Sequence, residues 1–225
     1  IGEFVLSLML MWMRHWPQLI DLQHRVSWPN HAEWVALGGR ELSGATLGII
    51  GLGAIGRHIA RLGRAFGMQV VAIRRTASHT QSDPDVDTLL PPDQLGELLA
   101  ASDFVVVSTP STPQTRHLIG ANELRMMRPN AFLVNISRGS TVDEVALAAA
   151  LTDGTIGGAG LDVFEEEPLP ASSPLWRLPN VIISPHLSGN TDQYSRRFTD
   201  LFLENLTHFR AGEPLRNTVD IERGY

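Results

Sequence analysis

The chain has 225 residues, of which 24 are acidic and 18 basic, and its formal net charge at pH 7 is −6. This charge, with no basic stripe along the chain, argues against nucleic acid as a partner. The chain has no cysteine, which excludes disulfides, thiolate nucleophiles and cysteine-ligated zinc and is typical of a cytoplasmic protein. All 18 basic residues are arginines, so no lysine is available for a Schiff base, a Walker-type phosphate site or a Tyr-x-x-x-Lys catalytic pair. We expect no metal site.

The first segment of the chain is strongly apolar between Phe4 and Met13. A transmembrane helix needs about 20 such residues, and no basic region precedes this shorter run as it would in a signal peptide. We therefore expect no membrane span and predict a buried helix over residues 1–16. Residues 21–41 are expected to be an irregular connecting arm. Because the chain begins with Ile and opens directly into a helix, it reads as a piece of a longer protein.

From residue 46 onward, short apolar runs alternate with helical patterns. Such alternation is typical of a parallel sheet with helices on both faces, which is the doubly wound, Rossmann-type α/β class. The pattern predicts strands at 46–50, 69–73, 104–108, 131–136, 157–163 and 181–184. It predicts helices at 54–66, 93–100, 121–127, 143–151 and 191–209. We expect the last helix to pack with the first one on one side of the sheet.

A glycine-rich turn follows the first of these strands. Gly51, Gly53 and Gly56 form a G-x-G-x-x-G sequence. In a dinucleotide site the first glycine makes a tight turn, the second lets the backbone approach a pyrophosphate, and the third lets the next helix pack closely on its strand. The hexapeptide alone is weak evidence, but the apolar strand before it and the helical pattern after it supply the required context. We expect a pyrophosphate at the start of that helix, at Ala54 and Ile55.

Three ionisable residues each follow a predicted strand: Arg138, Glu167 and His186. In an open parallel sheet, ligands bind beyond the carboxyl ends of the strands. Beside a nicotinamide, a histidine can donate a proton at neutral pH, a carboxylate can orient it and favour its charged form, and an arginine can bind a substrate carboxylate while polarising the carbonyl. Each residue alone has an ordinary explanation, as a surface ion pair, a solvated loop acid or a strand-end histidine. All three, together with the glycine turn, favour a catalytic site.

Four segments carry a more specific likeness, in the order Leu47–Gly53, Asn135–Gly139, Gly160–Pro170 and Ser184–His186. Together they resemble the D-isomer-specific 2-hydroxyacid dehydrogenases, and the likeness covers nearly the whole chain. The resemblance implies that Arg138 is the substrate arginine, His186 the acid/base and Glu167 its carboxylate partner. It also implies that Asp162 contacts the nicotinamide carboxamide. The full set of expected cofactor-binding residues is Gly51, Gly53, Ala54, Ile55, Gly56, Arg74, Arg75, Thr76, Pro110, Ile136, Ser137, Arg138, Asp162 and His186.

The end of the second predicted strand departs from the family pattern. Members that prefer NAD carry an acidic residue there that accepts the ribose hydroxyls, whereas this chain has Arg74, Arg75 and Thr76. A carboxylate would repel a 2'-phosphate, while two arginines and a neighbouring hydroxyl would bind it. We therefore predict NADP as the preferred cofactor and NAD as the alternative. The competing interpretation is that these arginines stack on adenine or face solvent.

The second departure is length, because the family has a preceding flavodoxin-like lobe that supplies backbone donors for the substrate carboxylate. We expect that lobe to be largely absent here. Residues 1–41 would then be an interdomain helix and a connecting arm used for dimerisation. Residues 42–188 would form the NAD(P)-binding domain, and residues 189–225 a C-terminal helix and tail.

The resemblance implies an oxidoreductase that transfers a hydride between NAD(P)H and a small 2-keto acid or D-2-hydroxy acid. Reduction of glyoxylate or hydroxypyruvate in a cytoplasmic homodimer is the expected activity. One alternative is a non-catalytic NAD(P)-sensing interaction module of the same fold. Another is a methyltransferase with a glycine-rich nucleotide loop, which Arg74 and Arg75 disfavour because a ribose-binding acid belongs at that place. The keto acid is not predicted, because its specificity would lie largely in the missing lobe.

Overall fold

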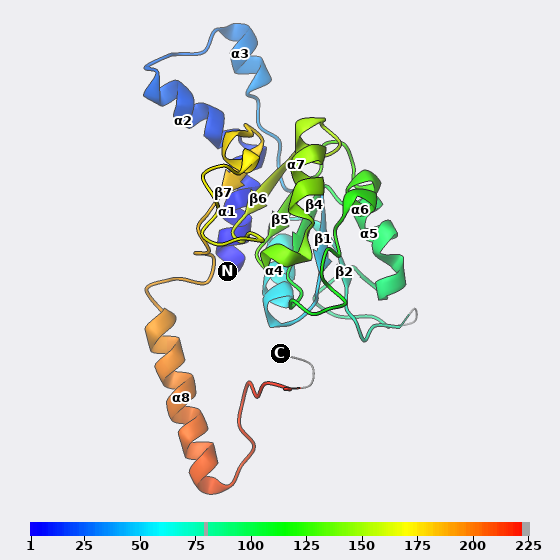
Figure 1. The fold of residues 1–225 in the computed structure, drawn as a ribbon, viewed down its shortest axis with the longest axis vertical. Helices are drawn as coiled ribbons and strands as arrows, with labels where there is room; N and C mark the ends of the chain where they lie inside the picture. Colours follow the sequence, from blue (N-terminus) through cyan, green and yellow to red (C-terminus); the bar gives the residue numbers. More distant parts are fainter. Residues whose placement is uncertain (79–80, 222–225) are drawn as a thin grey trace.

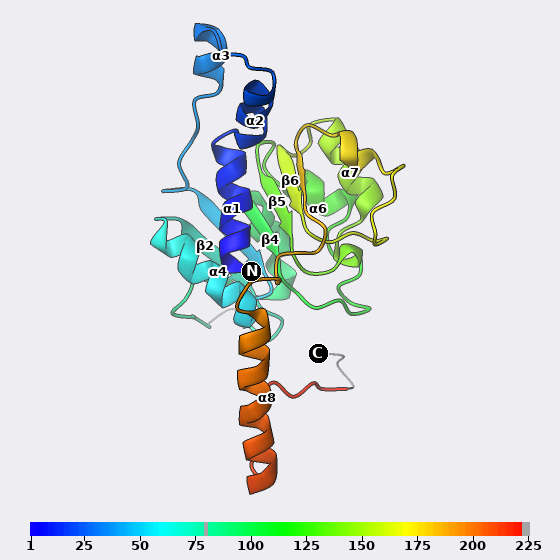
Figure 2. The same ribbon diagram turned by 90° about the vertical axis from the view of Figure 1, so that its left-hand side faces the viewer.

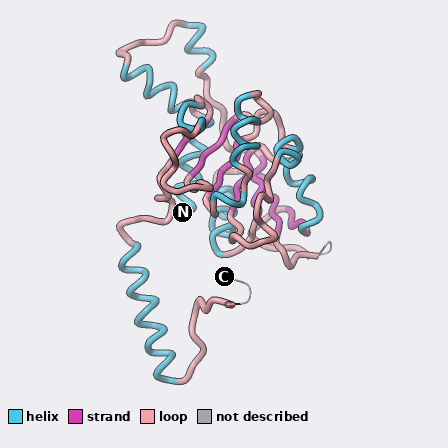
Figure 3. The backbone as a smooth tube through the Cα atoms, in the orientation of Figure 1, coloured by secondary structure: helices cyan, strands magenta, loops and turns pink. Residues whose placement is uncertain are grey.

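The computed structural model describes residues 1–78 and 81–221. Its centre is a seven-stranded parallel sheet with the strand order β3-β2-β1-β4-β5-β6-β7 (Figures 1 and 3). The strands are β1 (Thr46–Ile50), β2 (Gln69–Ile73), β3 (Thr88–Leu90), β4 (Phe104–Val107), β5 (Phe132–Asn135), β6 (Gly158–Leu161) and β7 (Val181–Ile183). The strand order reverses between β1 and β4, which is where ligands bind in doubly wound folds. The predicted Rossmann-type class is confirmed.

Helices cover both faces of the sheet (Figure 2). One face carries α1 (Gly2–Met13) and α4 (Ala54–Ala65), and the other carries α5 (Leu95–Ala101), α6 (Ala121–Met126) and α7 (Glu144–Thr152). Side chains alternate along each strand, so Phe104 and Val106 of β4 join the first layer while Val105 and Val107 join the second. Short 3-10 helices lie in the connections, at η1 (Pro92–Gln94), η2 (Gly139–Thr141) and η3 (Pro174–Arg177).

The N-terminal helix is part of this hydrophobic core, as its apolar sequence predicted. Val5 and Met9 of α1 have no exposed surface, and the Trp12 ring stacks on Phe132 of β5 with 4.9 Å between ring centroids. α1 packs against α4, β5 and β6. Within the described parts of the chain, every helix is too short or too polar to cross a membrane.

The predicted irregular arm, residues 21–41, instead contains the end of one short helix, α2 (Trp16–His24), and the whole of another, α3 (His31–Ala36). Asn30 starts α3 through a capping box with Glu33, in which each side chain accepts a hydrogen bond from the other residue's backbone N–H. None of the residues of α2 or α3 is buried, and both helices project beyond the sheet (Figure 1). The sequence interpretation was wrong here because exposed helices lack the buried apolar stripe that marks a helix most clearly.

The C-terminal helix α8 (Tyr194–Ala211) extends away from the sheet (Figures 1 and 2), and none of its residues is buried. The prediction that it packs along the N-terminal helix is therefore wrong. The reason is that α4 and the sheet already cover the apolar face of α1. Only the beginnings of the two helices approach, where Tyr194 and Phe198 line a cavity with Ile1 and Gly2.

Most other elements match their predictions to within a few residues, and β1 and β2 match in full. The predicted strands at 131–136 and 157–163 are shorter in the structure, since β5 ends at Asn135 and β6 at Leu161. The residues just beyond them leave the sheet and build the loops of the site. The edge strand β3 was not predicted, because three residues are too few to show an alternating pattern.

Candidate cofactor and catalytic site

The glycine turn connects β1 to α4 in the geometry that its sequence predicts. Gly51 has a φ of +104°, and a Cβ atom there would lie 2.9 Å from the carbonyl carbon of Ser108. A Cβ on Gly56 would lie 2.2 Å from the Gly51 carbonyl oxygen. Both positions therefore require glycine. At Gly53 no atom lies within 4 Å of a Cβ position, so the turn leaves open space on the side where a ligand could approach the backbone.

The N-terminus of α4 opens onto this space. Gly53 is the N-cap and no side chain caps the helix. First-turn N–H groups have no partner inside a helix, and the helix dipole makes this end attractive to anions. Ala54 and Ile55, in that first turn, are exposed. These features fit a dinucleotide pyrophosphate, which the backbone N–H groups of the turn and helix would hold.

The three predicted catalytic residues lie together at the carboxyl edge of the sheet. Arg138 follows β5, Glu167 lies in the loop after β6, and His186 follows β7. All three line one cavity of about 470 Å³. His186 Nδ1 lies 2.8 Å from Glu167 Oε2, so the other ring nitrogen, Nε2, is the atom left for proton transfer.

Glu167 is held in its charged form by its neighbours. Burial acts to raise the pKa of Glu167, but hydrogen bonds from His186 and from the Phe164 backbone N–H outweigh it, and the pKa lies below its ordinary value. The Phe164 bond to Oε1 is 3.0 Å long. Each carboxylate oxygen thus has its own donor, which fixes the carboxylate against the histidine.

Asp162 supports the turn that carries His186. Its side chain has no exposed surface, and its two carboxylate oxygens accept hydrogen bonds from the backbone N–H groups of Leu187 at 2.8 Å and Ser188 at 2.9 Å. The His186 N–H donates to the Asp162 carbonyl oxygen at 2.9 Å. His186 itself has a φ of +56°, a conformation that side chains other than glycine's rarely adopt. The structure thus gives Asp162 a positioning role, and the predicted carboxamide contact stays a prediction.

Arg138 is held by two residues that the sequence analysis did not single out. Its carbonyl oxygen accepts hydrogen bonds from Asn135 Nδ2 at 3.2 Å and Thr141 Oγ1 at 2.7 Å. Asn135 is buried at the end of an otherwise apolar strand. A polar residue at that place is the sequence feature that could have identified it as a site residue. Arg138 Nη1 donates to the Ser137 carbonyl oxygen at 2.7 Å. A Cβ on Gly139 would lie 1.8 Å from the Phe164 carbonyl carbon, so the loop of Glu167 packs directly on this backbone.

The remaining predicted cofactor residues lie along the same edge. Ile136 and Ser137 are buried just after β5, and the Ser137 hydroxyl donates to the Thr109 carbonyl oxygen. Pro110, the next residue in the chain, is exposed. The backbone after β4 and the backbone after β5 are therefore tied together beside the cavity.

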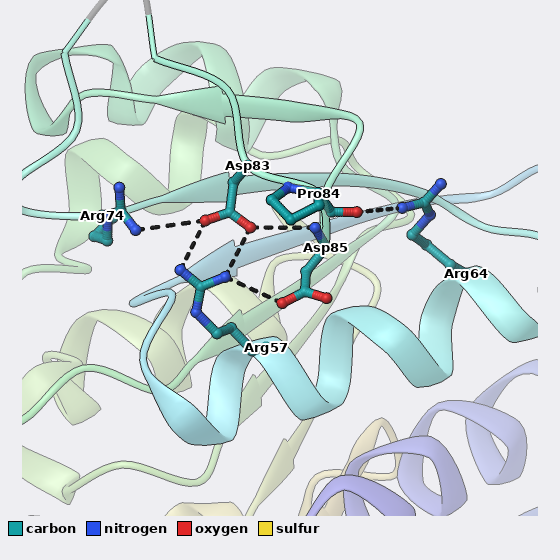
Figure 4. Close-up of polar contacts among 6 residues, drawn as sticks. All are labelled: Arg57, Arg64, Arg74, Asp83, Pro84 and Asp85. Carbon is teal, nitrogen blue, oxygen red and sulfur yellow. Dashed lines mark hydrogen bonds and ion pairs between the residues drawn. The ribbon is translucent and has the colours of Figure 1, made fainter.

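At the end of β2, the structure adds an acid that the sequence analysis missed. Arg74 follows β2, and its Nη1 lies 3.4 Å from Asp83 Oδ2. Asp83 also pairs with Arg57 of α4 (Figure 4). Its pKa is below the ordinary value, chiefly because it accepts hydrogen bonds from Arg57. Arg75 and Thr76 come next and are exposed.

Comparison with known proteins identifies the family. Residues 6–188 match the family model described as D-isomer specific 2-hydroxyacid dehydrogenase, NAD binding domain. The chain belongs to this family. It is 42% identical over 187 residues to a protein named glyoxylate reductase from Korarchaeum cryptofilum, covering 82% of this chain and 54% of that protein. The chain thus spans about half the length of this curated relative.

Solved structures of the family agree with the fold. A D-isomer specific 2-hydroxyacid dehydrogenase from Xanthobacter autotrophicus Py2, in complex with NADPH and MES, has a TM-score of 0.86 and 36% identity, covering 100% of this chain and 88% of its own. An NADPH-dependent glyoxylate/hydroxypyruvate reductase from Sinorhizobium meliloti, in complex with NADP and sulfate, has a TM-score of 0.87 and 29% identity, covering 100% of this chain and 69% of its own. The chain is an NAD(P)-binding domain of the 2-hydroxyacid dehydrogenase family.

Proposed function

We propose that the protein containing this domain reduces a small 2-keto acid, glyoxylate or hydroxypyruvate, to the D-2-hydroxy acid. The observation that carries the proposal is the pairing of His186 Nδ1 with Glu167 Oε2 at 2.8 Å, in the same cavity as Arg138. A proton donor, its carboxylate partner and a fixed cation are the groups that carbonyl reduction of a keto acid needs. The names of the relatives support the same chemistry.

Each residue has a distinct part in this proposal. The guanidinium of Arg138 binds the substrate carboxylate and polarises the carbonyl. His186 Nε2 gives a proton to the carbonyl oxygen, and Glu167 stabilises the imidazolium before the transfer. Bound NAD(P)H supplies the hydride. In the reverse direction, the same imidazole accepts the hydroxyl proton.

We infer a preference for NADP(H) from Arg74 and Arg75, which lie where the ribose is bound in this fold. The NADP(H) complexes of two related structures support this choice.

We also propose a cytoplasmic homodimer. Its contact surface would be the α2–α3 arm, where the exposed fractions of Trp28 and Trp34 are 92% and 63%. Sedimentation of the 225-residue chain tests the dimer, and a monomer at micromolar concentration would contradict it.

The decisive experiment is cofactor oxidation by the full-length protein, followed by absorbance with glyoxylate and with hydroxypyruvate. We expect turnover with at least one acid, and its loss in His186→Ala with cofactor affinity retained. Cofactor binding without turnover on any 2-keto acid would instead favour a non-catalytic NAD(P)-sensing module.

A further inference from the structure

An ion-pair cluster joins the beginning of α4 and the end of β2 to the segment 83–85 (Figure 4). Arg57, in the first turns of α4, donates from Nη1 and Nη2 to the two oxygens of Asp83, both at 2.7 Å. Arg57 Nη1 also donates to Asp85 Oδ2 at 3.0 Å. Arg64, farther along α4, donates to the Pro84 carbonyl oxygen at 2.7 Å. Two arginines of α4 therefore hold the segment 83–85 in place.

Asp83 is the centre of this cluster. Only 6% of its side chain is exposed, and the paired geometry with Arg57 is the strong, two-pronged form of a charge-assisted hydrogen bond. Its Oδ2 also faces Arg74 Nη1 at the longer distance of 3.4 Å. Asp83 therefore forms ion pairs with two arginines, a close one with Arg57 of α4 and a longer one with Arg74 at the end of β2.

Arg74 is only partly satisfied by this contact. Its Nε is buried and has no hydrogen-bond partner among the described residues, while its one described ion pair is the long one to Asp83. A buried donor without a partner is costly. The side chain of Arg74 is also 23% exposed, so the guanidinium can meet a second anion, but a carboxylate already lies beside it.

We propose that Asp83 is a specificity-determining residue for the cofactor. It competes with a 2'-phosphate for Arg74 and so limits how strongly this domain prefers NADP(H) to NAD(H). The inference rests on the proposed dinucleotide site and deepens it. Arg57 weakens this competition, because it binds the Asp83 carboxylate and so reduces the interaction of Asp83 with Arg74.

The charges explain the direction of the effect. The ion pairs around Asp83 join Arg57 and Arg74 to Asp83 and Asp85, and the formal charges of these four residues cancel. A 2'-phosphate brought to Arg74 meets a neutral cluster and, close by, a carboxylate that repels it. Removing the charge of Asp83 leaves a net positive cluster, which attracts the phosphate. NAD(H), which has hydroxyls at this place, gains little.

Two substitutions should have opposite effects on NADPH binding. Asp83→Asn keeps the shape of the side chain and one acceptor oxygen for Arg57, and it releases Arg74, so NADPH should bind more tightly. Arg57→Gln removes the main partner of Asp83, and of the described arginines paired with Asp83 only Arg74 remains, beside the hydrogen bond from the Asp85 backbone N–H. NADPH should bind more weakly in this variant, although Asp83 is intact. A merely structural disturbance of the loop would weaken both cofactors in both variants.

The experiment measures dissociation constants of NADPH and NADH for the 225-residue chain by nicotinamide fluorescence, with circular dichroism to verify folding. We expect Asp83→Asn to raise the NADPH-over-NADH affinity ratio about threefold to tenfold, and Arg57→Gln to lower it. Asp85→Asn is the matched control, because Asp85 shares the loop and the Arg57 partner and its described ion pair is with Arg57, not Arg74. The control should change the ratio less. In the double variant Arg74→Gln/Asp83→Asn, the increase in the NADPH-over-NADH affinity ratio should vanish.

An unchanged ratio in Asp83→Asn, or a gain that persists without Arg74, would overturn the inference while leaving the cofactor site standing. A rise in the ratio that comes from weaker NADH binding in Asp83→Asn, with NADPH binding unchanged, would overturn it too, since Asp83 would then be accepting the ribose hydroxyls. A wild-type chain that is folded but binds neither dinucleotide would reject the proposed site itself.

Discussion

His186 Nδ1 and Glu167 Oε2 lie 2.8 Å apart, although the two residues come from different loops at the sheet edge. The pairing follows from the topology, because β6 and β7 are parallel neighbours. Their carboxyl ends therefore meet at the same edge. Glu167 is ionised at neutral pH, since its pKa lies below the ordinary value. It can therefore stabilise an imidazolium across the neutral pH range.

The first prediction concerns this pair. In the full-length protein, keto-acid reduction should decline at high pH, because the transfer needs a protonated general acid. Glu167→Gln removes the charge that favours the imidazolium, so the alkaline limit of kcat should move to lower pH. Profiles of kcat against pH for both proteins measure the shift. The same alkaline limit in both would show that Glu167 does not act on the histidine.

The second prediction separates the proton donor from the substrate cation. His186→Ala should lower kcat by about a hundredfold or more, because a general acid contributes at least that much. Its cofactor affinity should be nearly unchanged. Arg138→Ala should raise KM and lower kcat together, since its contact exists before and during the reaction. Steady-state kinetics on the full-length variants test both. If Arg138→Ala changed only kcat, Arg138 would not be a substrate-binding residue.

The third prediction concerns cofactor choice. Arg74→Ala/Arg75→Ala should weaken NADPH binding by about tenfold to a hundredfold, the loss expected for charge-assisted contacts to a phosphate. NADH should change much less. Fluorescence titration of the 225-residue chain measures both constants. Equal affinities for the two cofactors in the wild type would contradict the proposed preference before any variant is made.

The fourth prediction follows from the depressed pKa of Asp83, which Arg57 causes. A carboxyl group whose pKa is lower in the folded state stabilises the fold above its unfolded-state pKa. That contribution is lost as pH falls through the folded-state value. The melting temperature should therefore fall on acidification, and it should fall less in Asp83→Asn. Asp192→Asn, at an exposed position, is the control and should follow the wild type. An identical acid response in all three proteins would count against the ion pair.

Local patterns in the sequence were enough for the glycine turn and for most strands. The apolar run before Gly51 and the helical pattern after Gly56 are adjacent in sequence, so neither needed a long-range contact to be recognised. The convergence of Arg138, Glu167 and His186 was also predictable, because a parallel sheet brings all strand ends to one edge.

Other features depend on contacts that the sequence does not reveal. Asp83 meets Arg57 across 26 positions of the chain, and nothing near Asp83 marks it as a partner of an α4 arginine. The place of α8 was not predictable either, since an amphipathic pattern shows that a helix has an apolar face but not what covers it. Asp162 and Asn135 act on backbone groups, and such roles appear only when the turns are built.

The last prediction concerns the 225-residue chain by itself, which should bind the cofactor with little or no turnover. The side chain of His186 is 48% exposed and that of Glu167 36% exposed, so water reaches the acid/base pair. Among the described residues that line this cavity, Arg138 alone carries a fixed positive charge for the substrate carboxylate, and one such contact leaves the carbonyl free to rotate out of line with the hydride donor. Cofactor oxidation with glyoxylate and hydroxypyruvate, on a sample whose intact mass is verified, measures this directly. The full-length protein, assayed in parallel, shows whether the assay works. Robust reduction by the verified 225-residue chain would show that the groups described here are sufficient to orient the substrate.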